Sequence, residues 1–203
     1  MIPAQLLIVS SLLLGSIPSG APLTAPNSHL WVVNEILSNA DGSIQFIEML
    51  ECCGSSIETS LAGKTMYSDA TGHQYTFPTN LTGDTAHRYL LLGTVAFAAL
   101  PGAPAPDFII PPGFFSTSGD TIRWFVYPNA TLSFGPGALP VNGVDSLRRD
   151  GTTGTNTPTN FAGQSGSIAA IVLVPAWSAG KLVALIALVL LTGSFLLVRR
   201  RAG

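Results

Sequence analysis

Histidine and cysteine are scarce in this chain of 203 residues, which contains three histidines and two cysteines. The cysteines are adjacent, at Cys52 and Cys53, so the chain has neither a multi-disulfide framework nor the C-x-x-C spacing of zinc and redox sites. The motifs G-x-S-x-G and H-E-x-x-H and the phosphate-binding glycine loop are also missing. The standard hydrolase, metalloprotease and nucleotide-binding signatures are therefore absent. We expect neither catalysis nor a cofactor.

Basic residues are few as well, and charged residues make up only 10% of the chain. All eleven acidic residues lie between positions 26 and 174, together with five of the nine cations, so this region has a net charge of −6. Its only adjacent cations are Arg148 and Arg149. An acidic surface repels phosphate backbones, and counterion release needs clustered cations. This excludes nucleic acid as an expected partner.

The N-terminal residues resemble a secretory signal. An apolar run covers residues 6–14, which is the length of a signal-peptide h-region and too short to span a bilayer. Gly15, Pro18 and Gly20 follow and break a helix. No Lys or Arg precedes the run, whereas positive charge is usual there. We interpret residues 1–25 as a signal peptide, which either is atypical in charge or has its true start upstream.

The C-terminal residues predict a single membrane span. Residues 182–198 contain no charge, and extension back to Trp177 gives a stretch close to the ~20 residues that a spanning helix needs. Arg199, Arg200 and Arg201 follow at once and mark the cytoplasmic side. We expect a transmembrane helix at 177–198 in contact with membrane lipid, a cytoplasmic tail at 199–203, and all preceding residues outside the cytoplasm.

The region between the two ends has the pattern of short strands separated by turns, with no sustained helical period, which favours an all-β sandwich. Residues 121–127 give the clearest example, because Ile122, Trp124 and Val126 alternate with more polar neighbours. The proline-rich residues 101–112 predict a loop around an edge strand. Residues 151–166, rich in Gly, Thr, Asn and Ser, predict either a flexible stalk or a terminal loop region. Strands are expected at residues 30–37, 45–51, 64–67, 74–77, 88–93, 107–110, 121–127 and 144–147.

Short motifs in this region resemble those of lamin-tail-like domains. They are Val32-Val33-Asn34-Glu35-Ile36, a following Asp41-Gly42-Ser43-Ile44-Gln45-Phe46-Ile47-Glu48-Met49, Ser118-Gly119-Asp120-Thr121-Ile122-Arg123-Trp124, Val144-Asp145-Ser146-Leu147 and Asn156-Thr157-Pro158-Thr159-Asn160. The resemblance covers about residues 30–162 and implies an immunoglobulin-like β-sandwich. It carries no catalytic residues and leaves the ligand open.

Two further groups of residues admit alternatives. Cys52 and Cys53 follow a predicted strand, and side chains alternate in a strand, so one buried and one outward thiol is the simplest arrangement. A vicinal disulfide and an intermolecular bridge are the other possible arrangements, and we favour a structural over a redox role.

Asn39, Asp41 and Ser43 offer oxygen ligands at alternate positions, as calcium loops do, but the same sequence is typical of a plain hairpin turn.

The C-terminal end resembles bacterial PEP-CTERM-type sorting tails, which combine a short proline-containing motif, one helix and a basic cluster. Here the motif residues are Val174, Pro175, Ala176, Trp177 and Ser178, and the Pro-Glu-Pro itself is absent. The resemblance implies recognition by a membrane-embedded sorting enzyme after a stalk and motif at 163–176. A permanent single-pass anchor remains the alternative.

The sequence therefore predicts an exported, membrane-anchored cell-envelope protein. Its β-sandwich would bind an envelope protein or polysaccharide, or serve a structural purpose, without catalysis. The rival prediction is a membrane-tethered hydrolase. A hydrolase requires a histidine, such as His73 or His87, to converge with a carboxylate in a cleft, whereas an interaction module is a largely filled sandwich.

Overall fold

The computed structural model describes residues 27–169. The predicted signal peptide at 1–25, sorting motif at 174–178, membrane helix at 177–198 and basic tail at 199–203 lie outside these residues. Among the residues described, no helix is both long enough and apolar enough to cross a membrane.

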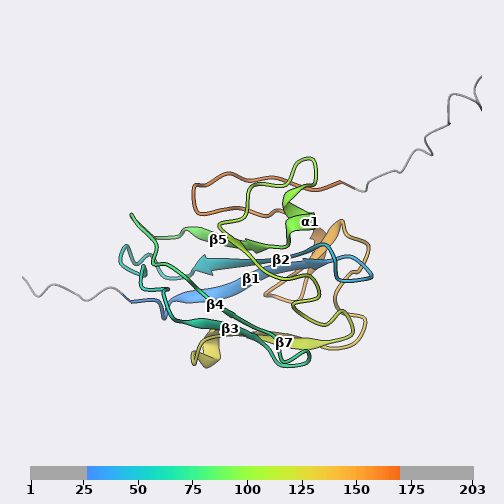
Figure 1. Ribbon diagram of the computed structural model, residues 1–203, viewed down its shortest axis with the longest axis horizontal. Coiled ribbons are helices and arrows are strands. Elements are labelled where there is room, and N and C mark those ends of the chain that lie inside the picture. Colours follow the sequence, from blue (N-terminus) through green and yellow to red (C-terminus); the bar gives the residue numbers. More distant parts are fainter. Residues whose placement is uncertain (1–26, 170–203) are drawn as a thin grey trace, which may run out of the picture.

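Ten strands form two sheets that pack face to face (Figure 1). The larger sheet has the order β10-β9-β1-β2-β5-β6 and the smaller sheet the order β4-β3-β7-β8. Neighbouring strands are antiparallel except β5 and β6, which pair in parallel. A short helix, α1, and a 3-10 turn, η1, complete the elements of residues 27–169. The bounds are β1 Trp31–Ser38, β2 Gln45–Glu51, β3 Thr65–Ser68, β4 Gln74–Thr76, β5 Tyr89–Gly93, α1 Val95–Ala98, β6 Phe108–Ile109, β7 Asp120–Trp124, η1 Pro128–Ala130, β8 Leu132–Phe134, β9 Asp145–Arg148 and β10 Thr153–Thr155.

A bulge in β1 decides which of its residues enter the core. The register with β2 shifts between Val33 and Glu35, which leaves Asn34 as the extra residue. Val33 and Ile36 therefore both lie in the main core, although they are three positions apart. Glu35 is directed to the other face of the larger sheet, where Ser146 and Thr157 bind its carboxylate. Without the bulge, strand alternation would place Glu35 in the apolar core.

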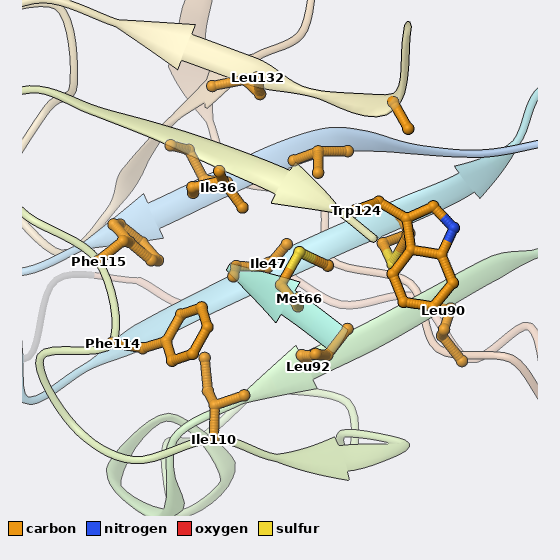
Figure 2. Packing of buried hydrophobic residues seen from close by; sticks show 14 of the residues in the cluster. Ile36, Ile47, Met66, Leu90, Leu92, Ile110, Phe114, Phe115, Trp124 and Leu132 are labelled. Carbon is orange, nitrogen blue, oxygen red and sulfur yellow. The ribbon is translucent and has the colours of Figure 1, made fainter. Parts of the chain in front are cut away.

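The main core fills the space between the sheets. Figure 2 shows Ile36, Ile47, Leu90 and Leu92 of the larger sheet directed toward Met66 and Trp124 of the smaller one. The Phe77 ring packs edge-on against Trp124, with 5.0 Å between ring centroids, and against Phe108 at 4.9 Å. The Trp124 indole N–H, buried by this packing, donates a hydrogen bond of 2.8 Å to the Ser28 carbonyl.

A second apolar cluster lies on the opposite face of the larger sheet. It contains Leu37, Phe46 and Leu91 from the sheet, Phe97 from α1, and Ile168 near the end of the described residues. Figure 1 shows α1 and the last described residues on the side of β1 and β2 away from β3 and β7. The molecule therefore has three layers, because this cover buries one face of the larger sheet and the smaller sheet buries the other.

The all-β class and the two sheets confirm the sequence prediction, with three local differences. Strand β7 ends at Trp124, because Phe125 adopts a φ of 47°, and Val126 is consequently 71% exposed rather than part of the inward face. Strands β8 and β10 were not predicted. Residues 151–166 form a terminal loop region packed on the sheet rather than a flexible stalk, since they include β10 and the buried Asn156 and Asn160.

Candidate functional site

Cys52 and Cys53 are joined by a disulfide just beyond the end of β2. Both residues are exposed, so the expectation of one buried and one outward thiol is wrong. Both side chains are exposed because β2 ends at Glu51, so the alternation of side chains in a strand does not apply to the residues that follow. Of the alternatives left open by the sequence, the structure has the vicinal disulfide.

The Glu51 carboxylate organises the turn that carries this disulfide. It is buried and accepts backbone N–H hydrogen bonds from Cys53 at 3.1 Å, Gly54 at 2.8 Å and His87 at 2.9 Å. Burial acts to raise the pKa of Glu51, but the N–H groups of His87 and the Cys53–Gly54 turn outweigh it, so the net pKa is lowered. An anionic Glu51 thus ties the turn to the segment around His87.

A second group of buried carboxylates lies under the C-terminal residues 156–168, which we call the strap. Glu35 accepts hydrogen bonds from the N–H and the hydroxyl of Thr157, both at 2.9 Å. Glu48 accepts from the Thr159 N–H at 2.7 Å and from the Asn34 side-chain amide at 2.7 Å. These bonds fasten the strap to the outer face of β1 and β2.

Further bonds extend this attachment along the strap. Asp107, which precedes β6, accepts a hydrogen bond of 2.9 Å from the Phe161 N–H and one of 2.8 Å from the Leu91 N–H. The Asn156 side chain is fully buried, donates to the carbonyls of Val144 and Ile168, and accepts from the Ile168 N–H. The strap is therefore held along its length by a series of hydrogen bonds, and Ile168 adds an apolar contact at its end.

Desolvation raises the pKa of Glu48 to about 8. The charge of the neighbouring Glu35 adds to this rise, while the Asn34 and Thr159 hydrogen bonds oppose it. Burial likewise raises the pKa of Asp107. No cation forms an ion pair with Glu35 or Glu48 within residues 27–169. The strap is thus held mainly by hydrogen bonds rather than by charge pairing.

A surface hollow of about 390 Å³ lies between β8 and β9. Leu132 and Leu147 give it an apolar side, and Arg149 also lines it. The Arg149 guanidinium donates hydrogen bonds to the carbonyls of Val33, Thr131 and Asn129. Arg149 therefore links β1 of one sheet to the residues that lead into β8 of the other.

The histidines named for a hydrolase do not meet a carboxylate. Nδ1 of His73 lies 3.0 Å from the Gly113 carbonyl oxygen, and the contact of His87 with Glu51 is made by its backbone N–H. Nδ1 of His29, in contrast, lies 3.4 Å from Glu58 Oε1, an association that sequence reasoning missed. Within the described part of the chain, no hydroxyl or thiol is hydrogen-bonded to the His29 ring.

The candidate calcium ligands form a hairpin turn. Asp41 accepts the Ser43 N–H at 2.9 Å, and the Asn39 side-chain oxygen accepts the Ile44 N–H at 3.0 Å. The Asp41 bond, to the residue two positions on, is that of an Asx turn, and the Asn39 bond closes the loop between β1 and β2. In the described portion of the chain, no three His, Cys, Asp or Glu side chains are grouped so that they could hold a metal ion.

The fold and these sites define an all-β, two-sheet domain with a strapped outer face and an exposed vicinal disulfide. Comparisons of the chain with family models, with curated proteins and with solved structures gave no match.

Proposed function

We propose that the protein is an exported cell-envelope protein, anchored by a C-terminal membrane helix, whose non-catalytic β-sandwich serves binding or structural purposes outside the cytoplasm. The lipid bilayer is its first partner. A membrane-embedded sorting enzyme acting at residues 174–178, and an envelope protein or polysaccharide at the domain surface, are further proposed partners.

The observation that carries this proposal is the filled sandwich. Its main core contains fully buried side chains from both sheets, among them Trp31 of β1 and Trp124 of β7, and the hollow at Arg149 is an open one at the edge where β8 of one sheet faces β9 of the other. Such a domain presents surfaces instead of an enclosed reaction chamber. The hydrogen bonds of Glu35, Glu48 and Glu51 to backbone N–H groups give these carboxylates a structural use.

Two observations support export. An exposed disulfide persists in oxidising compartments outside the cytoplasm, whereas reducing thiols keep such a pair open inside it. Ile168, near the end of the described residues, packs in the second apolar cluster, and the apolar residues 182–198 follow it in the sequence. Nucleic acid is an unsuitable partner, because the region is acidic and Arg149 uses its guanidinium on backbone carbonyls.

The lamin-tail-like, immunoglobulin-like classification is part of the proposal. Its motif segments meet in space: Glu35 and Glu48 from the first two motifs bind Thr157 and Thr159 from the last, and Ser146 also binds Glu35. Motifs 122 residues apart along the chain thus form one hydrogen-bonded seam. A shared structural purpose for these residues supports the resemblance.

The rival function, a tethered hydrolase, has the His29–Glu58 pair in its favour. A histidine oriented by a carboxylate is one half of a nucleophilic site. The other half would be a nucleophile on the His29 ring, and the Ser55 hydroxyl bonds to Glu58 Oε1 at 3.5 Å instead. We therefore prefer the binding or structural function.

Labelling of the disulfide pair tests the topology. Intact spheroplasts of a bacterial host expressing the full chain are reduced with a membrane-impermeant phosphine and then treated with an impermeant maleimide. We expect Cys52 and Cys53 to be labelled as fully in intact as in lysed spheroplasts, while a cytoplasmic cysteine protein is labelled only after lysis. The double variant Cys52→Ser, Cys53→Ser is the control for specificity. Labelling that requires lysis would contradict export.

A further inference from the structure

The Cys52–Cys53 disulfide links neighbouring residues and therefore closes no loop of the chain. A disulfide stabilises a fold chiefly by restricting the unfolded chain, and this effect grows with the length of the loop that is closed. Neither cysteine belongs to an apolar core cluster. The bond therefore adds little to the stability of the fold, and its presence requires another explanation.

Both cysteines are open to solvent. Thiol–disulfide exchange needs a thiolate to reach one sulfur along the direction of the bond, so exposure is its first requirement. Buried disulfides are protected from soluble thiols by their surroundings, and this pair has no such cover. The exposed position allows a thiol of another molecule to attack.

An imidazole is held beside the turn that carries the pair. A side-chain carbon placed on Gly54 would lie only 2.9 Å from Nε2 of His87, so the His87 ring rests against the residue that follows Cys53. The backbone of His87 has a φ of 53°, an uncommon conformation for a residue with a side chain. Its N–H shares the Glu51 carboxylate with the N–H groups of Cys53 and Gly54. One buried anion therefore fixes the turn and the histidine together.

We propose that Cys52–Cys53 is a thiol–disulfide exchange site whose substrate is a thiol from outside the chain, and that His87 supplies the proton for the sulfur that leaves. The substrate thiolate attacks one sulfur, the bond between Cys52 and Cys53 breaks, and a mixed disulfide forms. The departing cysteine takes a proton from the His87 imidazolium. A second substrate thiol then attacks the mixed disulfide, which releases the oxidised substrate as a disulfide. The chain gains two electrons and two protons.

The first experiment counts free thiols on the full chain purified in detergent. The protein is incubated with millimolar reduced glutathione, quenched with an alkylating reagent and analysed by intact mass. We expect no label before glutathione and two labels per chain after it, while the urea midpoint of the domain stays unchanged on reduction. Two labels without glutathione, no label after it in a chain that takes two once denatured and reduced, or a clear fall in the urea midpoint would each overturn the proposal.

The second experiment isolates His87. His87→Asn removes the imidazole and keeps a residue that tolerates a positive φ, and His73→Asn is the matched control on an exposed histidine at another turn. Proton donation by a positioned side chain accelerates a step by about a hundredfold or more, so we expect His87→Asn to slow reduction by at least about tenfold at pH 6. The control should retain the wild-type rate. Equal rates and equal pH profiles for His87→Asn and the wild type would overturn the assignment of His87.

Discussion

Glu35 of β1 lies directly opposite Glu48 of β2 in the larger sheet, and both side chains are buried beneath the strap. Two carboxylates at neighbouring strand positions would repel each other if both were ionised. The rise in the pKa of Glu48 to about 8 relieves this repulsion, because Glu48 then retains its proton at neutral pH.

This pair predicts that stability falls with rising pH. The folded chain holds the Glu48 proton up to about pH 8, whereas the unfolded chain releases it near the ordinary value of 4.5. Unfolding between these two pH values therefore releases a proton, and the free energy of unfolding decreases by up to about 1.4 kcal/mol for each pH unit. Glu48→Gln, which mimics the neutral acid, should remove this part of the slope.

The measurement is urea unfolding of the full chain in detergent, followed by tryptophan fluorescence from pH 5 to pH 8.5. Comparison with the variant is needed because other groups contribute. The raised pKa of Asp107 acts in the same direction at lower pH, and the lowered pKa values of Asp41 and Asp150 act in the opposite one. Identical slopes for the wild type and Glu48→Gln would refute the assignment.

The strap should detach locally when Asn156 is truncated. Asn156→Ala removes the side-chain bonds to Val144 and Ile168 and leaves buried backbone groups unsatisfied, which costs about 1–3 kcal/mol. Amide hydrogen exchange of residues 157–168 should accelerate by about 5- to 150-fold, the equivalent of that free energy, while β1 and β2 keep their protection. Ser165→Ala, which loses one exposed hydroxyl contact with Thr159, is the control. Uniform acceleration over the whole domain would mean that the strap does not open separately.

Arg149 should contribute more to stability than its neighbour Arg148. Arg149 donates to three carbonyls at the junction of the two sheets, whereas Arg148 donates to the Thr155 carbonyl of adjacent β10. Replacement by methionine keeps much of the aliphatic volume and removes the donors. We expect Arg149→Met to lower the free energy of unfolding by about 1–2 kcal/mol and Arg148→Met by less than half of that. If urea denaturation gave equal losses in the free energy of unfolding for the two variants, a special role of Arg149 in joining the sheets would be contradicted.

Processing of the C-terminal residues distinguishes sorting from permanent anchoring. Cleavage near residues 175–178 predicts that the mature chain purified from the envelope lacks Gly203, and that Pro175→Ala impairs processing alone. Replacement of Arg199, Arg200 and Arg201 by neutral residues should impair membrane orientation and processing together. Intact-mass analysis reads both variants. A wild-type chain that still ends at Gly203 in a host with its sorting enzyme would establish the permanent anchor.

The sequence predicted best where strands bury one face in the core. Residues 45–51 were assigned to β2 with both bounds correct, because Ile47 and Met49 enter the main core at alternate positions and a turn precedes the strand. Strand β8 has only three residues between turn-forming segments, and β10 is Thr-Gly-Thr, a composition typical of loops. Such short strands are set by their partners rather than by their own residues.

The strap and the Glu51 turn illustrate the same limit. The sequence feature that could have indicated the strap is the pair Glu35 and Glu48 within apolar strands, since buried carboxylates require hydrogen-bond donors. Their donors, Thr157 and Thr159, are more than a hundred residues away, so local pattern could not identify them. The disulfide was one of the arrangements open for Cys52 and Cys53. Its exposure depends on where β2 ends and on the N–H groups that Glu51 collects.

The strap also determines how the domain responds to tension. If residues 182–198 anchor the chain, any pull between a bound surface and the membrane is transmitted to the domain through Ile168. The contacts of Asn156, Thr157 and Thr159 lie along the strap and would yield one after another, as a zipper opens, before the two sheets are loaded. Such peeling lengthens the tether while the sandwich stays folded. In a chain anchored in this way, the strap would therefore open before the sandwich unfolds.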